Sequence, residues 1–232
     1  MDFTNHRIWP LFTIKGHTVY ITESIFATWI IMAVLFIFTI AARYKINSFK
    51  ERPAAGSIQN LLELAVESMH NMAESNLGKR LSWLGGYFFG VFAFILACNY
   101  SSLFKLRPPT TDFATTLALA LNTFFLIHVL GLVYRKGEYL KDYFKPIFVF
   151  LPTNIIGELS RPVSLSFRLF GNILGGFIML ELLYASLPAV FRIAIPDIFH
   201  FYEDIFIGAL QAFIFCVLSM TFIKEKASEE EA

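Results

Sequence analysis

Charge, cysteine and tryptophan are all scarce in this sequence. Only 16% of its 232 residues are charged and 56% are hydrophobic, whereas a soluble domain has roughly 25% charged residues. The 19 basic and 18 acidic residues leave a net charge of +1, which excludes a strongly basic nucleic-acid binder and an acidic disordered chain. The 27 phenylalanines far outnumber the 3 tryptophans, as suits a surface facing lipid tails. With a mean hydropathy of +0.59, the chain is expected to lie mainly in lipid.

The sequence lacks the motifs that mark several functional classes. Cys98 and Cys216 lie in apolar runs without metal-ligand spacing or a disulfide framework, so both are expected to be core residues. The nucleophile motif G-x-S-x-G and the zinc motif H-E-x-x-H are absent, which argues against an intramembrane enzyme and against a bound metal or cofactor. No internal repeat is visible, so residues 1–232 are expected to form a single membrane domain. A stand-alone ion or solute transporter remains the alternative function, although an inverted repeat would be expected of it.

Long apolar runs dominate what is present. A helix needs about 20 apolar residues to cross a bilayer, and five segments meet this need, the last two with charges inside them. These spans are 24–42, 81–104, 113–134, 146–187 and 197–224. The segment 1–23 lacks the basic start and cleavage pattern of a signal peptide, so it is expected to be an external N-terminal segment. The sequence thus predicts an all-α polytopic membrane protein with five membrane-crossing helices.

The basic residues of the loops predict the orientation of the chain. Twelve Lys and Arg residues follow the first span, the third span and the last span, whereas the alternate segments hold five. Because cytoplasmic loops carry the excess of basic residues, the N-terminus is predicted to be outside and the C-terminus in the cytoplasm.

The stretch 58–74 does not resemble a span. Its apolar residues, from Ile58 to Ala73, recur at i, i+3, i+4 and i+7, whereas Glu63 and Glu67 lie away from that stripe. It is predicted to be an amphipathic helix on the cytoplasmic surface, resting on lipid headgroups or packed on a partner.

Arg168 is the least expected charge, because an arginine at mid-membrane requires a partner, a water-filled cavity or a function. On a helix, Arg161, Ser164, Arg168, Asn172 and Gly175 fall on one narrow stripe. A guanidinium stays protonated at any biological pH, so it cannot relay protons but can attract a carboxylate that does. The alternative is an internal salt bridge. Its candidate partners are Glu158, Glu181 and Asp204.

Ionisable residues also mark the last span. On a regular helix His200, Asp204 and Gln211 lie within about 40° of one another, and Glu203 lies about 100° away. These residues could belong to an ion pathway, or could mark an interfacial helix start, where acidic side chains are favoured. Glu181 lies some 20 Å along its helix from Arg168, which places it either in a separate aqueous pathway or in the outer headgroup layer.

Two sequence segments carry a family resemblance. Ser-Arg-Pro-Val-Ser-Leu-Ser-Phe-Arg-Leu-Phe-Gly-Asn at 160–172, with Leu-Gln-Ala-Phe-Ile-Phe at 210–215, resembles subunit a of F-type ATP synthases. Asp112, followed by Thr-Thr-Leu-Ala-Leu at 115–119, also looks like the family's fourth helix, although Asp112 is equally suited to cap that helix. The order of the spans agrees over essentially the whole chain.

The resemblance implies a non-catalytic stator subunit in a bacterial cell membrane. Its last two helices would form a long tilted hairpin against the ring of c subunits, with the b-subunit peripheral stalk as a further partner. Arg168 would match the family's essential arginine, which meets the ring carboxylate and blocks direct leakage between two offset half-channels. Asn172 and Gln211 would match polar positions that line the pathway near it.

The chain departs from the family pattern at one position. Many family members carry an acidic residue nine positions after the arginine, where this sequence has Phe177. Glu181 and Asp204 are therefore the candidates for the outer half-channel, with His200, Glu203 and Ser164 as further candidate residues. The coupling ion, H⁺ or Na⁺, is left open.

Overall fold

The computed structural model describes residues 7–14, 17–46, 58–104, 106–144, 147–188 and 194–227. The acidic C-terminal end, the first residues of the external segment and the first residue of the predicted 146–187 span therefore lie outside the described residues.

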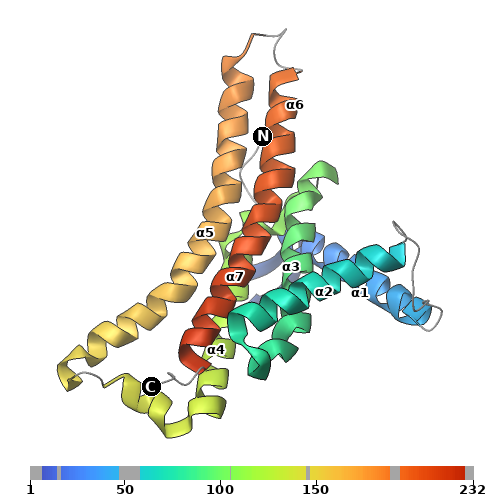
Figure 1. Cartoon of the computed structure of the whole chain (residues 1–232). Coiled ribbons are helices and arrows are strands. Elements are labelled where there is room, and N and C mark those ends of the chain that lie inside the picture. Colours follow the sequence, from blue (N-terminus) through green and yellow to red (C-terminus); the bar gives the residue numbers. More distant parts are fainter. Residues whose placement is uncertain are drawn as a thin grey trace.

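Five helical segments are long and apolar enough to cross a membrane, so the prediction of five spans is confirmed (Figure 1). The first two are α1 (Glu23–Ile46) and the segment made of η1 (Lys79–Leu84), α3 (Gly85–Tyr100) and η2 (Ser101–Phe104). Next come α4 (Phe113–Asp142), preceded by η3 (Pro109–Thr111), and α5 (Leu151–Ser186), preceded by η4 (Phe148–Phe150). The last runs through α6 (Ala194–His200), the π-helical turn η5 (Phe201–Ile207) and α7 (Gly208–Ala227).

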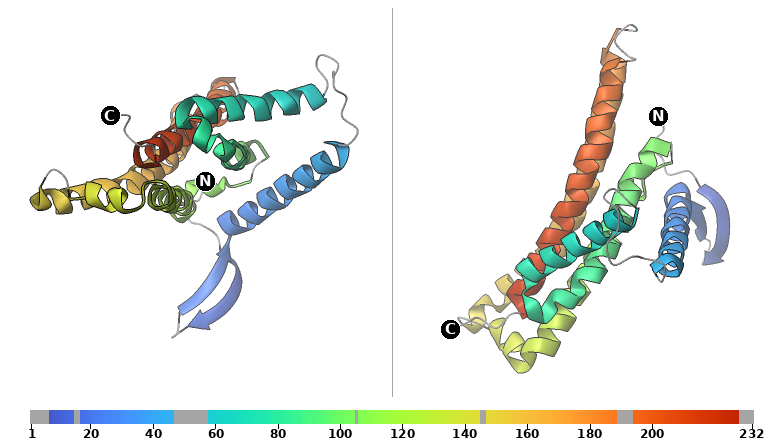
Figure 2. Two further views of the ribbon diagram at one scale, coloured as in Figure 1. Left: turned by 60° about the horizontal axis from the view of Figure 1, so that its bottom comes forward. Right: turned by 45° about the vertical axis from the view of Figure 1, so that its right-hand side comes forward.

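A small β-hairpin precedes α1, where the sequence predicted only an external segment. Strand β1 (Arg7–Ile14) pairs with β2 (His17–Thr22) in antiparallel register, with two irregularities along β1. Both strands are rich in β-branched and aromatic residues, which favour extended backbone. Figure 2 shows the hairpin projecting away from the helices.

The amphipathic helix is α2 (Ile58–Leu77), and its apolar stripe divides into two parts. Met69, Ala73 and Leu77 are buried in the cluster that η1, α3, α4 and α7 complete. In the first half of the helix, Leu61 and Leu64 are exposed. Only the second half of α2 therefore packs on this chain, and the first half offers its apolar side chains to lipid or to a partner.

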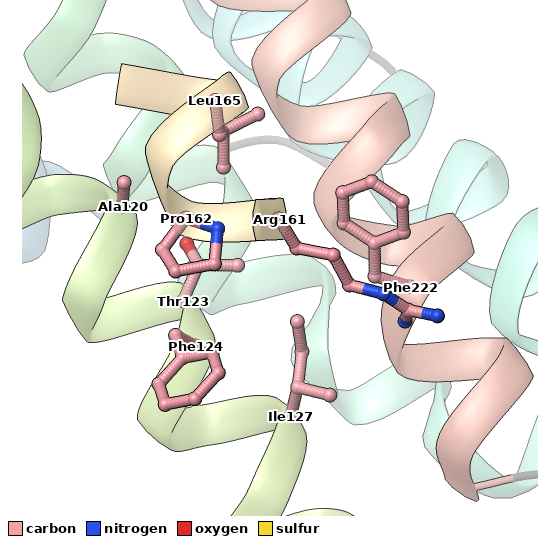
Figure 3. A pocket seen from close by; sticks show the side chains of 8 residues that line it. All are labelled: Ala120, Thr123, Phe124, Ile127, Arg161, Pro162, Leu165 and Phe222. Atoms are coloured by element: carbon pink, nitrogen blue, oxygen red, sulfur yellow. The ribbon is translucent and has the colours of Figure 1, made fainter. Parts of the chain in front are cut away.

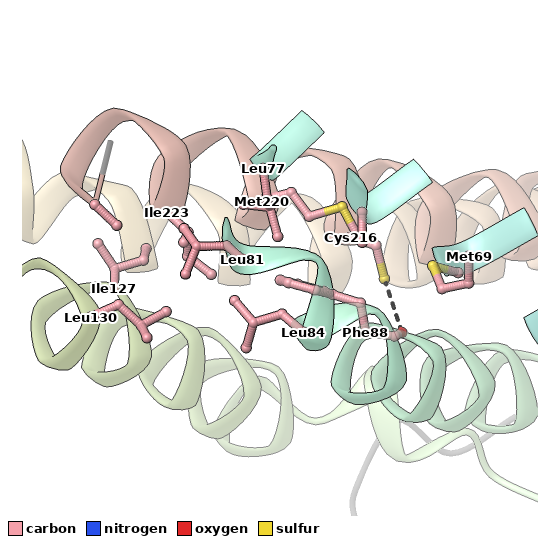
Figure 4. Close-up of a cluster of buried hydrophobic side chains, with 12 residues drawn as sticks. Met69, Leu77, Leu81, Leu84, Phe88, Ile127, Leu130, Cys216, Met220 and Ile223 are labelled. Atoms are coloured by element: carbon pink, nitrogen blue, oxygen red, sulfur yellow. Dashed lines mark hydrogen bonds between the residues drawn. The ribbon is translucent and has the colours of Figure 1, made fainter. Parts of the chain in front are cut away.

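The main core lies where α2, η1, α3, α4 and α7 meet (Figure 4). Leu84, Phe88, Met220 and Ile223 are almost completely buried there. Cys216 also lies in this core, and its Sγ is 3.7 Å from the carbonyl oxygen of Phe88. Both cysteines are free and buried, so the prediction that they are core residues is confirmed.

Helix α4 packs against both α5 and α7. The last span, from α6 into the start of α7, runs beside α5 in the upper part of Figure 1, and the two helices separate below. Leu165 and Leu169 on α5 pack with Ala212 and Phe215 on α7 in a second cluster. Pro162 lies inside α5, where it removes one backbone hydrogen bond and favours a bend. Helix α4 and the first half of α7 thus pack against one face of α5 around Leu165 and Leu169.

Candidate functional site

Arg168 lies on the uncovered face of α5. Its side chain is exposed, as are Ser164 before it and the glycines Gly171 and Gly175 after it. The opposite face of the same turns is buried and faces α4 and α7. Two other polar residues of the predicted stripe are half-buried: Asn172, and Arg161, which reaches Glu225 at the end of α7. Arg168 therefore points away from the chain's own core.

Contacts with α4 fix the rotation of α5 around its axis. Ser166 and Thr116 are both fully buried, and their hydroxyl oxygens are 3.1 Å apart. Phe113, in the first turn of α4, packs against Phe167 and Phe170, with ring centroids 5.0 Å and 5.7 Å away. These contacts turn the two residues that flank Arg168 toward α4 and leave Arg168 itself on the outer face.

The start of α4 is fixed by its own cap. Asp112 accepts a hydrogen bond from the backbone N–H of Ala114 at 3.1 Å, which confirms the capping prediction. This cap satisfies one of the free N–H groups at the helix start and holds Phe113 where it contacts α5.

Within the described part of the chain, Arg168 forms no ion pair. Two of its proposed partners are engaged elsewhere, because Glu158 pairs with Lys226 and Arg161, and Asp204 pairs with His200. The internal salt bridge considered as an alternative thus has no described partner. A guanidinium at membrane depth requires a partner or a water-filled cavity, and the described residues supply no ion-pair partner for Arg168.

Gln211 and Glu181 occupy different surroundings from Arg168. Gln211 is buried on α7, beside Ala212 of the second hydrophobic cluster. Glu181 is half-buried in the last turns of α5, away from the Thr116 contact. The structure therefore spreads the candidate residues along the α5 and α7 hairpin.

A histidine and two carboxylates gather in the last span at η5. His200 Nδ1 lies 3.1 Å from Asp204 Oδ2, and the Tyr184 ring on α5 lies 6.3 Å from the His200 ring. The His200 side chain is 39% exposed and that of Asp204 is 16% exposed. Because η5 is π-helical, the angles expected between Asp204 and Gln211 on a regular α-helix do not apply.

Glu203 lies against Gly176 of α5, an arrangement that sequence reasoning did not predict. A Cβ atom at Gly176 would collide with the Glu203 side chain, including its carboxylate. Gly176 therefore leaves the space on α5 that the Glu203 side chain occupies. The sequence did contain a signal, because glycines inside membrane helices mark close helix contacts.

A second polar cluster lies where the start of α5 meets the end of α7. Glu158 is buried and pairs with Lys226 Nζ at 2.5 Å and with Arg161 Nε at 3.6 Å. Arg161 also pairs with Glu225 at 2.6 Å, and its guanidinium lies over the Phe222 ring (Figure 3).

An open pocket of about 320 Å³ adjoins this cluster. Burial raises the pKa of the Tyr143 hydroxyl that lines the pocket. With two acidic and two basic residues, the cluster is neutral and acts as a clamp between α5 and α7. In the described residues no group of three or more His, Cys, Asp and Glu side chains could hold a metal ion.

Comparison with known proteins agrees with this geometry. The family model for the ATP synthase A chain matches residues 25–224. ATP synthase subunit a of Moorella thermoacetica is 34% identical, over 88% of this chain and 89% of the relative. The same subunit of Trichlorobacter lovleyi is 32% identical over 87% of this chain and 86% of its own length. The chloroplastic subunit a of Stigeoclonium helveticum is 29% identical over 97% of this chain and 90% of its own length. The predicted resemblance is confirmed, and the chain belongs to the ATP synthase subunit a family.

Proposed function

We propose that this chain is the non-catalytic stator subunit that couples ion flow to rotation in an ATP synthase. In this role it provides two offset aqueous half-channels that face a ring of c subunits. An H⁺ or Na⁺ ion enters from one half-channel, travels on the rotating ring and leaves through the other. Ring rotation then drives ATP synthesis elsewhere in the complex.

The observation that carries the proposal is the position of Arg168. Its side chain is exposed on the open face of α5, and it forms no ion pair in the described chain. A fixed positive charge there stabilises a ring carboxylate in its ionised form and lowers that group's pKa, which favours ion release as the carboxylate approaches. The same charge repels a free cation, so it opposes direct leakage between the half-channels.

The remaining polar residues are assigned to the pathway by position. Ser164 and Asn172 lie on the stripe of α5 that carries Arg168, and Gln211 is buried on the neighbouring helix α7. We assign all three to the pathway near the arginine. The outer half-channel is assigned to four ionisable residues: Glu181, His200, Glu203 and Asp204. Glu203, held beside Gly176, supplies a carboxylate next to Phe177, where many family members carry an acidic residue on α5 itself.

The partners and the location follow from the same role. The open face of α5 is the surface we assign to the c-subunit ring. The first half of α2, with its exposed Leu61 and Leu64, is available to lipid or the b-subunit peripheral stalk. We place the chain in a bacterial cell membrane, with the N-terminus outside and the C-terminus in the cytoplasm, because the basic loops alternate in that sense.

The proposal is tested by ion-driven ATP synthesis in vesicles that contain the assembled complex. H⁺ and Na⁺ gradients are imposed separately on the wild type and on Arg168→Ala. We expect Arg168→Ala to assemble but to lose coupled synthesis, and the gradient that drives the wild type identifies the ion. Arg43→Ala is the matched control, because Arg43 is exposed in the last turn of α1. Normal coupling by Arg168→Ala would contradict the proposal.

A further inference from the structure

Two polar side chains at the end of α3 reach across to the π-helical turn of the last span. Asn99 Nδ2 donates a hydrogen bond to the carbonyl oxygen of Gly208 at 2.9 Å, and the Tyr100 hydroxyl donates to that of Ile205 at 3.3 Å. Asn99 is 4% exposed, so its amide depends on protein partners for hydrogen bonding. These bonds join the end of α3 to the last part of η5 and to the first residue of α7.

Thr110 fixes the orientation of the Asn99 amide. Its hydroxyl is fully buried and donates to Asn99 Oδ1 at 3.0 Å. Because Oδ1 accepts this bond, the Nδ2 group is turned toward Gly208. The chain Thr110, Asn99, Gly208 therefore connects η3, α3 and the start of α7.

Glycine allows the backbones to come this close. A Cβ atom at Gly208 would lie 3.1 Å from the Asn99 Cβ atom, and a Cβ atom at Gly176 would overlap the Glu203 side chain. The turn η5 is thus held from two sides, by hydrogen bonds from α3 and by direct packing on α5.

The segment held in this way has an unusual geometry. In η5 the N–H of Gly208 bonds to the carbonyl of Glu203, five residues earlier, instead of four. Such turns are rare in helices and are frequent at functional sites. If the turn relaxed to α-helical spacing, Glu203 and Asp204 would rotate around the helix axis relative to Gln211.

We infer that Asn99, oriented by Thr110, is a positioning residue that holds η5 so that Glu203 lies beside Gly176 and Asp204 lies beside His200. The inference rests on the proposed function, in which both carboxylates belong to the outer ion pathway. Asn99 and Thr110 act through the backbone of Gly208.

The decisive variant is Thr110→Val, which nearly keeps the side-chain shape and replaces the hydroxyl with a methyl group that cannot donate a hydrogen bond. ATP synthesis is measured in vesicles with the assembled complex while the ion concentration on the entry side is varied. We expect the concentration that gives half-maximal rate to rise by about 3- to 10-fold, as for the loss of one buried hydrogen bond. Thr110→Ser keeps the hydroxyl and should restore the wild-type value. Asn99→Leu should give a larger rise in whatever complex assembles.

Ser101→Ala is the matched control. Ser101 is also buried in this region, but its hydroxyl bonds to the carbonyl of Cys98 in the preceding helical turn. It is expected to leave the half-maximal concentration unchanged. A rise in this variant equal to that of Thr110→Val would overturn the inference, because any small defect near α3 would then suffice.

A mutant cycle separates positioning from general packing. In a Glu203→Gln, Asp204→Asn background, Thr110→Val should add little further effect, since all three changes act on the same two carboxylates. Fully additive effects, or no effect of Thr110→Val alone, would overturn the inference. If Arg168→Ala abolishes coupling while the cycle is additive, the positioning role fails and the proposed function stands. If Arg168→Ala still couples, the proposed function itself fails.

Discussion

At the residue scale, Arg168 is the side chain whose chemistry has no substitute in this chain. It is exposed on α5, and the neighbouring Phe167 and Phe170 are turned toward Phe113. A planar guanidinium can form two parallel hydrogen bonds with a carboxylate, whereas a lysine ammonium is a compact point charge. The proposed role thus depends on geometry as well as on charge.

Arg168→Lys tests this dependence. We expect the variant to assemble, but to lower ion-driven ATP synthesis by about an order of magnitude or more, because the paired hydrogen bonds are lost and the ammonium can deprotonate when desolvated. The rate per assembled complex is compared with the wild type in vesicles. Synthesis at a near-wild-type rate would show that positive charge alone is sufficient.

Gly176 gives a prediction that depends on steric packing rather than on charge. Gly176→Ala places a methyl group where the Glu203 side chain lies, so the Glu203 carboxylate must move away or the two helices must separate, at a cost of up to about 1–3 kcal/mol. We expect slower ion translocation in the assembled complex. Gly157→Ala on the same helix is the control, since a Cβ atom there meets nothing within 4 Å. Equal rates for the two variants would show that the Glu203 position does not affect transport.

These two residues illustrate what the sequence could and could not predict. Arg168 was identifiable because an isolated charge within an apolar run has a known energetic cost. The Asp112 cap was identifiable because the hydrogen bond is local to the helix start. The contact between Gly176 and Glu203 joins different helices, and local spacing gives no rule for which residues meet.

At the element scale, the clamp between α5 and α7 supports a stability prediction. Glu158→Gln removes the carboxylate that pairs with Lys226 and Arg161 inside the protein. Removing one partner of a buried ion pair costs about 3–5 kcal/mol, so we expect a lower midpoint for thermal dissociation of the purified complex in detergent. Glu225→Gln is the control, because Glu225 is 53% exposed and exposed pairs contribute about 1 kcal/mol or less. The prediction is wrong if both variants dissociate at the same temperature.

The sequence predicted some of the secondary-structure elements and missed others. The five spans follow from length and hydrophobicity, and α2 follows from its apolar periodicity. The hairpin β1–β2 was missed, because its short strands lie beside a membrane helix and carry no strong alternating pattern. The π-helical turn η5 was missed for another reason: it is supported by Asn99 and Tyr100 from a distant helix.

At the scale of the whole molecule, most of the helical surface is left for lipid and other subunits. In the five candidate spans, only 11% to 39% of the most apolar window is buried inside the chain. α1 has the lowest share, and its exposed residues are mostly large and apolar. A soluble protein with this surface would aggregate, so membrane and partner subunits complete the fold.

The odd number of spans gives a final prediction, that the two ends of the chain lie on opposite sides of the membrane. Native Cys98 and Cys216 are buried, so single cysteines introduced at exposed positions can be labelled over a low background. We choose Trp9→Cys in β1, which is 70% exposed, and Lys224→Cys near the end of α7, also exposed. A membrane-impermeant maleimide should label position 9 from outside the cell and position 224 only in inverted vesicles, because the basic loops favour the cytoplasm. If both positions are labelled from the same side, the chain does not cross the membrane five times. If position 224 is labelled from outside the cell and position 9 only in inverted vesicles, the orientation is opposite to the one proposed, and the outer and inner half-channels exchange sides.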